Sequence, residues 1–389
     1  MRRVRAEKSK WKEELVDLAR FPDVVLEVGR SSIGEGVRIG KGTVIVADEL
    51  VLGDDVAIGP DCDLRSAHLE FDTGAQVGAG CRWLVADRAW LGAGSVVDAG
   101  AEVVCREWAV GAGCYLGARL RIGAGASMEE RSIVTIGDRC QIAPDVVINP
   151  TEPVVIGDEV GISAQVAIFT HGYHAGHPVR AGHGASFSGV RVGNGVWLGL
   201  RAVLLPGVSV GAGTVVAASA TVNRSLPPEV LAAGVPAVVK RQLAPVALDD
   251  AGRNEAVDVL LRAWIERLRF KGLKVEPSGP AGGSSGYVVA GVAGRWAVEQ
   301  VPGGGRRAVA GIEIRSGGGE CAVFDFAEPL AVRGRLDDLG HDLRDFLRRA
   351  TWLFPYDGNS RGLVPERFAR LQNAIAGTSG RAGHPPMAR

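Results

Sequence analysis

Residues 192–222 read VGNGVWLGLRAVLLPGVSVGAGTVVAASATV, and in this stretch an apolar residue returns at every sixth position. The repeating positions are Val192, Leu198, Leu204, Val210, Val216 and Val222. A period of six matches neither the 3.6-residue period of a helix nor the alternation of a simple strand, and it is typical of a parallel β-helix built from hexapeptides. Each hexad is expected to form a short strand and a turn, with the apolar side chain inward and the following glycine permitting a tight corner.

The same period extends toward the N-terminus, where apolar residues followed by glycine recur from about residue 28 onward. These residues are Ile33, Ile39, Leu52, Ile58, Val77, Leu91, Val110, Leu116, Ile122, Ile136 and Ile156. The period is less regular in residues 43–110 than in residues 110–222. If three hexads close one coil, about 200 residues make about eleven stacked coils.

The segments on either side of the repeat have different patterns. Residues 6–20 place Trp11, Leu15 and Leu18 at helical spacing, which predicts a helical cap within residues 1–24. The β-helix is expected over residues 25–241, with Pro227-Pro228 ending the coil. A separate α+β domain of unknown role is predicted over residues 255–375. Its expected helices span 256–268, 336–353 and 365–374, and its expected strands span 287–293, 296–301, 308–314 and 321–326.

Composition indicates a cytoplasmic protein that binds neither nucleic acid nor membrane. Lys plus Arg and Asp plus Glu each total 44, so no net basic charge favours a polyanionic partner. The N-terminal residues contain no apolar segment typical of a signal peptide, and no run approaches the ~20 apolar residues of a membrane span. The six cysteines form no CxxC pair and are expected to be buried free thiols.

The hexad rhythm breaks at residues 166–189, VAIFTHGYHAGHPVRAGHGASFSG. Four of the seven histidines fall in this break, at positions 171, 174, 177 and 183. A repeating scaffold that is interrupted once, with titratable side chains in the interruption, is expected to have its active site there.

The closing coils carry a family resemblance. Residues 196–241 read VWLGLRAVLLPGVSVGAGTVVAASATVNRSLPPEVLAAGVPAVVKR and combine the hexad phase, Pro206-Gly207, Pro227-Pro228 and the closing AGVPA. This combination resembles the hexapeptide-repeat acyltransferases, in particular the maltose, galactoside and antibiotic O-acetyltransferases. The resemblance implies a mostly β fold with a left-handed parallel β-helix, a homotrimer, and acetyl-CoA or another acyl-CoA bound between neighbouring subunits. It also implies a catalytic histidine on a loop just before the last coils.

The catalytic histidine is expected to be His171 or His174, with His177 as a further alternative. Acyl transfer from a thioester needs a general base that removes the proton of the attacking hydroxyl or amine, and histidine suits this role near neutral pH. His171 follows the strand at 166–169 directly, whereas ungapped alignment puts Tyr173 at the family's histidine position, beside His174. His177-Pro178 resembles the His-Pro of several relatives.

The resemblance also implies positions for the CoA. Trp197 matches a tryptophan that lines the cleft, while Leu200 and Ala218 match positions that offer backbone groups to the pantetheine arm. The polar and basic positions near the nucleotide correspond to Asn223, Arg224, Lys240 and Arg241, and cations there suit phosphate.

The acceptor is expected to be a small molecule: a sugar, a nucleotide sugar or a natural product with a hydroxyl or amine. Galactoside-type relatives carry a sugar-binding Asn one coil before the loop, but Ala143 stands there, with Gln141 and Asn149 nearby. Two other functions remain open, a non-catalytic β-helix scaffold and a γ-class carbonic anhydrase. The latter needs zinc ligands on separate coils, whereas these histidines cluster in one loop, and no metal is expected.

Overall fold

The structure is a computed structural model of the 389-residue chain. It describes residues 21, 23–123, 129–172, 182, 187–243, 248–278, 286–291, 294–301, 311–319, 321–327 and 330–349. The chain divides into two compact units, the first extending to Ala244 and the second beginning at Pro245. The cap expected in residues 1–24 and the helix expected at 365–374 lie outside the described residues, apart from Phe21, Asp23 and Val24.

The first unit is a parallel β-helix whose coils present three faces, named A, B and C here in chain order. Five long strands each span faces A and B: β1 (Val25–Ile33), β3 (Val44–Leu52), β5 (Asp63–Phe71), β7 (Arg82–Leu91) and β9 (Glu102–Val110). From there the two faces have separate strands. Face A continues with β11 (Arg121–Ile122), β14 (Val147–Asn149), β17 (Ala167–Phe169), β20 (Val203–Leu204) and β23 (Thr221–Val222). Face B continues with β12 (Ile133–Ile136), β15 (Val154–Ile156), β18 (Val190–Val192) and β21 (Ser209–Val210).

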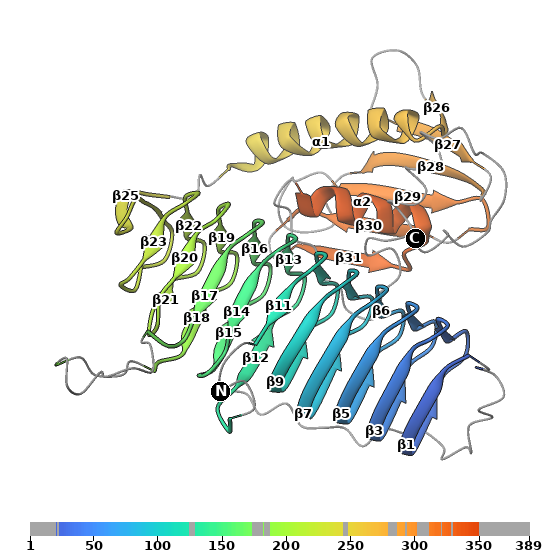
Figure 1. The fold of residues 1–389 in the computed structure, drawn as a ribbon. Helices are drawn as coiled ribbons and strands as arrows, with labels where there is room; N and C mark the ends of the chain where they lie inside the picture. Colours follow the sequence, from blue (N-terminus) through green and yellow to red (C-terminus); the bar gives the residue numbers. More distant parts are fainter. Residues whose placement is uncertain are drawn as a thin grey trace. The chain divides into compact units, whose positions relative to one another are not determined.

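Face C is a second sheet made mostly of two-residue strands. Its strands are β2 (Arg38–Ile39), β4 (Ala57–Ile58), β6 (Gln76–Val77), β8 (Val96–Val97), β10 (Tyr115–Leu116), β13 (Gln141–Ile142), β16 (Gly161–Ile162), β19 (Trp197–Leu198), β22 (Val215–Val216), β24 (Val230–Ala233) and β25 (Val238–Gln242). All neighbours in this sheet are parallel except β24 and β25, which are antiparallel and end the coil. The parallel β-helix predicted from the hexads is therefore confirmed (Figure 1).

The first five coils are longer than three hexads, which explains their irregular period. Val25 pairs with Val44 and Val44 with Asp63, so these coils take 19 residues, except that the coil from Arg82 to Glu102 takes 20. The long strand bends between faces A and B without a turn, and the ladder skips the bend residues Gly29 and Asp48. Ten strands follow one another along face A, so the estimate of about eleven coils was one too high.

The interior of the β-helix is filled by the hexad positions. The inward side chains are almost fully buried from the second coil onward, whereas Ile33 and Ile39 of the first coil are only partly buried. In the early coils the buried side chains include Phe71, Trp83 and Trp108. These three rings meet edge to face, with centroid distances of 5.6 and 4.6 Å. Large rings fit here because the longer coils enclose a wider core than three hexads do, and edge-to-face pairs are a favoured aromatic arrangement.

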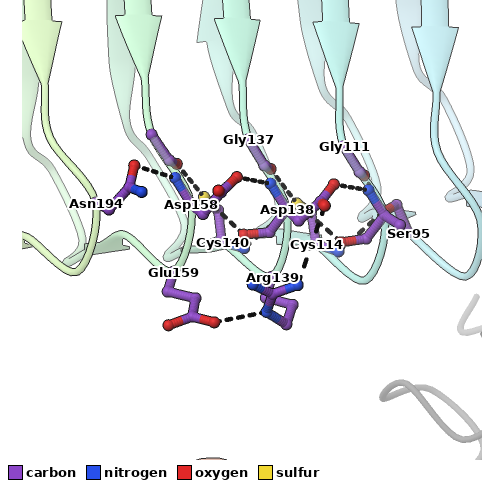
Figure 2. Close-up of polar contacts among 12 residues, drawn as sticks. Ser95, Gly111, Cys114, Gly137, Asp138, Arg139, Cys140, Asp158, Glu159 and Asn194 are labelled. Atoms are coloured by element: carbon purple, nitrogen blue, oxygen red, sulfur yellow. Dashed lines mark hydrogen bonds and ion pairs between the residues drawn. The ribbon is translucent and has the colours of Figure 1, made fainter. Parts of the chain in front are cut away.

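The corner between faces B and C shows why the hexads need glycine. Ala112 N–H, Asp138 N–H and Asp158 N–H each donate to a side-chain oxygen of the next coil, on Asp138, Asp158 and Asn194 in turn, at 2.8–3.0 Å (Figure 2). A Cβ on the hexad glycines Gly111, Gly137 and Gly157 would lie 2.2–2.3 Å from these same oxygens.

The expected reason for the hexad glycine was therefore wrong at this corner. Gly111, Gly137 and Gly157 are outside the left-handed region, which Gly113, Arg139 and Glu159 occupy two residues later. The hexad glycine is needed because the next coil approaches too closely for a Cβ, while the left-handed turn position accepts other residues.

Cysteines take part in the same corners as small hydrogen-bonding side chains. Cys114 and Cys140 donate their thiols to the carbonyl oxygens of Gly137 and Gly157, as the Ser95 hydroxyl does to Gly111 (Figure 2). The expectation of buried free thiols is confirmed for five cysteines, whereas Cys321 is half-buried. Burial, with a smaller contribution from Glu107, raises the pKa of the Cys105 thiol to about 12, so this thiol is neutral at pH 7.

The second unit is an antiparallel sheet with two helices. It contains α1 (Asp250–Phe270), β26 (Lys274–Pro277), β27 (Gly286–Gly291), β28 (Gly294–Val301), β29 (Gly311–Ser316), β30 (Cys321–Asp325), β31 (Ala331–Gly334) and α2 (Asp338–Arg349). The six strands pair in sequence order. Apolar residues of both helices, such as Trp264 and Leu343, form one core with Val298, Ile312 and Phe324. The expected α+β character is confirmed, although the edge strands β26 and β31 were not predicted.

No helix in the described part of the chain is long and apolar enough to cross a membrane.

The corner ladder gives a stability prediction at Asp158. Asp158→Ala leaves the Asp138 N–H without its acceptor, and we expect the free energy of unfolding to fall by about 1 kcal/mol. Asp158→Asn keeps an acceptor oxygen, as Asn194 does in the next coil, and should leave stability unchanged. Urea unfolding followed by circular dichroism measures both. An equal loss in the two variants would show that the negative charge, rather than the hydrogen bond, matters at this corner.

Candidate active site

The corner between faces A and B changes character along the β-helix. In the first five coils it is the bend inside a long strand, and a groove of about 570 Å³ runs along this bend past Glu27, Asp48, Arg65 and Leu84. From β11 onward, separate segments join face A to face B, and the segment between β17 and β18 contains the histidine cluster. The groove and the histidine loop therefore lie on the same edge of the β-helix but on different coils.

Thr170 fixes the start of the histidine loop to the preceding coil. Its side chain is fully buried, and its hydroxyl donates to the Asn149 carbonyl oxygen at 2.8 Å while accepting from the Glu152 N–H at 2.9 Å. The Ser188 N–H donates to the Thr170 carbonyl oxygen at 2.9 Å, and His171 forms an antiparallel bridge with Phe187. The two ends of the loop are thus held together on the rigid stack.

The imidazole of His171 is oriented by its neighbours. Its ring lies between those of Phe169 and Phe187, at centroid distances of 6.4 and 6.5 Å. Nδ1 lies 3.3 Å from Oγ1 of Thr151, which belongs to the preceding coil. The half-buried ring is therefore attached to the scaffold through the contact of its Nδ1 with Thr151.

An ion pair lies beside this site. Nε of Arg131 is 2.6 Å from Oε2 of Glu152, and the Glu152 side chain is 17% exposed against 66% for Arg131. Arg131, Glu152 and His171 come from three successive A–B corners. Consecutive coils thus place a histidine, a carboxylate and a cation, up to 40 residues apart in sequence, on neighbouring turns of the same edge.

The structure places one of the expected catalytic histidines. His171 is at the site just described, whereas His174 and His177 lie outside the described residues. Within the described ranges, no three or more His, Cys, Asp or Glu side chains are grouped to hold a metal ion. Asn149 lies in the His171 site, while Gln141 is on face C and Ala143 is in the corner between faces C and A.

Several residues expected to bind CoA lie on or beside face C. The register aligns Trp197 with Val215, Val215 with Leu231, and Leu231 with Arg241. The Trp197 indole is 56% exposed and donates its Nε1–H to the Ser163 hydroxyl at 3.1 Å. Three ladder steps separate the tryptophan from Arg241, which is roughly 14 Å at the strand spacing. Lys240 is also exposed on β25.

The remaining predicted positions fall on two different edges. Leu200 and Ala218 stack in successive C–A corners, where the Ser219 N–H donates to the Leu200 carbonyl oxygen. Asn223 and Arg224 follow β23 and are exposed at the A–B edge, two coils beyond His171 and roughly 10 Å along the axis.

Within one chain, His171 and Trp197 lie on opposite sides of the β-helix. In a three-faced coil the A–B corner, which carries His171, is the corner opposite face C, which carries Trp197. The buried apolar core lies between them. One chain therefore does not bring the expected base and the expected CoA-binding face together.

Thr151, Glu152 and Arg131 were not predicted as site residues. A signal was present, because eight residues separate the hexad positions Ile148 and Ile156 where six are normal. Only the stacking of coils shows that it lies beside His171.

Comparison with known proteins finds acetyltransferases that are similar to part of the chain, although no protein-family model matches it. The galactoside O-acetyltransferase of Escherichia coli K12 is 40% identical over 91 residues, which cover 23% of this chain and 44% of the relative. A putative acetyltransferase of Saccharomyces cerevisiae is 38% identical over 116 residues, covering 29% and 57%. A putative lipopolysaccharide biosynthesis O-acetyltransferase of E. coli K12 is 31% identical over 118 residues, covering 28% and 60%. The chain thus spans about half the length of these curated relatives.

A solved hexapeptide-repeat acetyltransferase from Vibrio cholerae, complexed with acetyl-CoA, is 27% identical, with 40% of this chain and 71% of that chain covered and a TM-score of 0.25.

These sequence relatives agree with the resemblance found in the closing coils, and they show that part of this chain is related to a galactoside O-acetyltransferase and to putative acetyltransferases.

Proposed function

We propose that this protein is an acyl-CoA-dependent acyltransferase, in which His171 acts as the general base. The observation that carries this is the imidazole of His171, which the preceding coil holds in the interruption of the β-helix, in a chain similar to acetyltransferases. The acceptor is a hydroxyl or amine of a sugar, nucleotide sugar or natural product. The thioester supplies an activated acyl group, so the protein has to orient the acceptor and remove its proton.

The residues around His171 support a direct transfer. The imidazole accepts the proton of the attacking hydroxyl or amine as the new ester or amide bond forms and the carbon–sulfur bond breaks. The CoA thiolate then takes up a proton, which returns the imidazole to its neutral state. At the same corner, the Glu152 carboxylate can accept hydrogen bonds from a polar substrate, and the Arg131 guanidinium can donate hydrogen bonds to it.

Face C provides features that fit an acyl-CoA. The exposed indole of Trp197 and the apolar Val215 and Leu231 form a row that ends at Arg241. An extended, partly apolar arm that ends in phosphates would contact these groups in this order, with the guanidinium on a phosphate.

The first prediction concerns the base. His171→Ala should reduce release of free thiol from acetyl-CoA by ~10²–10⁴-fold, the loss typical of a missing general base, and leave CoA affinity nearly unchanged. Thiol release and calorimetric titration with CoA measure the two quantities. Full activity in His171→Ala with loss in His174→Ala would move the base three residues along the loop. Full activity in both, and in His177→Ala, would contradict general-base catalysis by this loop.

The second prediction concerns the phosphate contact. Arg241→Ala removes a charged hydrogen-bond donor, a type of contact that contributes about 1.5–3 kcal/mol, so the dissociation constant of CoA should rise about tenfold to hundredfold. Turnover at saturating acetyl-CoA should change little, because the contact is already made in the ground state. Arg38→Ala, which removes the same charge at the far end of face C, is the control. Equal CoA affinity in the wild type and Arg241→Ala would place the phosphates elsewhere.

The third prediction is a homotrimer. Because His171 and Trp197 lie on opposite sides of one chain, a complete site requires the A–B edge of one copy to pack against face C of another. Sedimentation equilibrium should give a mass three times that of one chain. A monomer at micromolar concentration that still turns over acetyl-CoA would contradict the shared site.

A further inference from the structure

Thr151 connects His171 to the buried amide of Asn149. The Thr151 hydroxyl donates to Oδ1 of Asn149 at 3.3 Å, and its Oγ1 lies 3.3 Å from Nδ1 of His171. Thr151 is 9% exposed and Asn149 is 6% exposed. The contact with the imidazole is therefore made on its buried side, on a coil held rigidly by the stack.

The direction of these hydrogen bonds sets the protonation pattern of the ring. A threonine hydroxyl has one proton and two lone pairs, and here the proton is given to the Asn149 amide oxygen. Toward His171 the hydroxyl can then only accept. The neutral imidazole satisfies this contact when Nδ1 carries the proton, which leaves the lone pair on Nε2.

Among the described residues, the Thr151 hydroxyl makes no hydrogen bond to the backbone of the corner. The backbone bonds that close this corner come from Thr170, whose hydroxyl bridges the Asn149 carbonyl oxygen and the Glu152 N–H, and from the Val190 N–H, which donates to the Pro153 carbonyl oxygen. The hydroxyl of Thr151 instead contacts two side chains, Asn149 and His171. Its position is explained by the orientation of the imidazole.

We infer that Thr151 and Asn149 are a positioning pair that holds the His171 imidazole as its Nδ1–H tautomer. Nε2 is then the atom that takes the proton from the hydroxyl or amine of the substrate. This inference rests on the proposed function of His171. It adds the identity of the basic nitrogen and the residues that select it.

The tautomer can be measured without any acceptor. In full-length protein labelled with ¹⁵N in histidine, long-range proton–nitrogen spectra distinguish a protonated Nδ1 from a protonated Nε2, and His171→Gln identifies the signals. We expect His171 to be the Nδ1–H tautomer in the wild type and in Thr151→Ser, and to lose that preference in Thr151→Val. Thr135→Val makes the same change at an exposed position of β12 and should leave the spectrum of His171 unaltered.

Turnover provides the second readout. Thr151→Val should lower thiol release from acetyl-CoA by about 10²-fold, as expected for a misoriented catalytic group, with CoA affinity unchanged. Thr151→Ser keeps the hydroxyl and should restore most of the rate, and Thr135→Val should be fully active.

The outcomes separate this inference from the proposed function. An Nε2–H tautomer in the wild type overturns the inference, and this result does not depend on whether Thr151→Val folds. Wild-type turnover in Thr151→Val, together with an inactive His171→Ala, also overturns it while leaving the proposed base in place. Full activity in His171→Ala instead removes the proposed function, whatever the tautomer.

Discussion

The structure depends on how closely successive coils approach at the B–C corner. There a backbone N–H of one coil donates to Asp138, Asp158 or Asn194 of the next, in space that exists because the hexad glycine has no Cβ. The Ser95, Cys114 and Cys140 side chains bond to the glycine carbonyls of the same corner. Because these contacts recur from coil to coil, they fix the height and register of each coil on the one before it.

The A–B corner varies more along the stack than the B–C corner does, and it carries the candidate site. In the first five coils it is a bend within one strand, while later coils carry segments of different length between β11 and β12, β14 and β15, and β17 and β18. A corner with connections of such different length tolerates insertions, as loops on rigid scaffolds generally do. Thr170 nevertheless fixes the start of the longest segment to the preceding coil, so His171 is placed by the scaffold rather than by the loop.

A rigid triangular cross-section also has a consequence for assembly. The corner that bears His171 is opposite the face that bears Trp197 and Arg241, and the apolar core separates them. Under the proposed function, the chain therefore needs a second copy to complete its site. The same geometry explains why the predicted CoA positions do not gather on one surface: Asn223 and Arg224 share the edge of His171, whereas Leu200 and Ala218 lie at the C–A corner.

The sequence by itself determined the β-helix, the approximate end of the coil and the position of its interruption, because a six-residue period is a local property that each hexad expresses independently. It also placed the candidate catalytic histidine in this interruption, with His171, His174 and His177 as alternatives. Only the tertiary structure decided what surrounds that histidine. Thr151 and Glu152 contact the start of the histidine loop, and Arg131 pairs with Glu152, only because coil stacking brings separate turns together. The role of the hexad glycine was misread for the same reason: its necessity comes from the side chain of the next coil, about 20 or more residues away, which no local pattern contains.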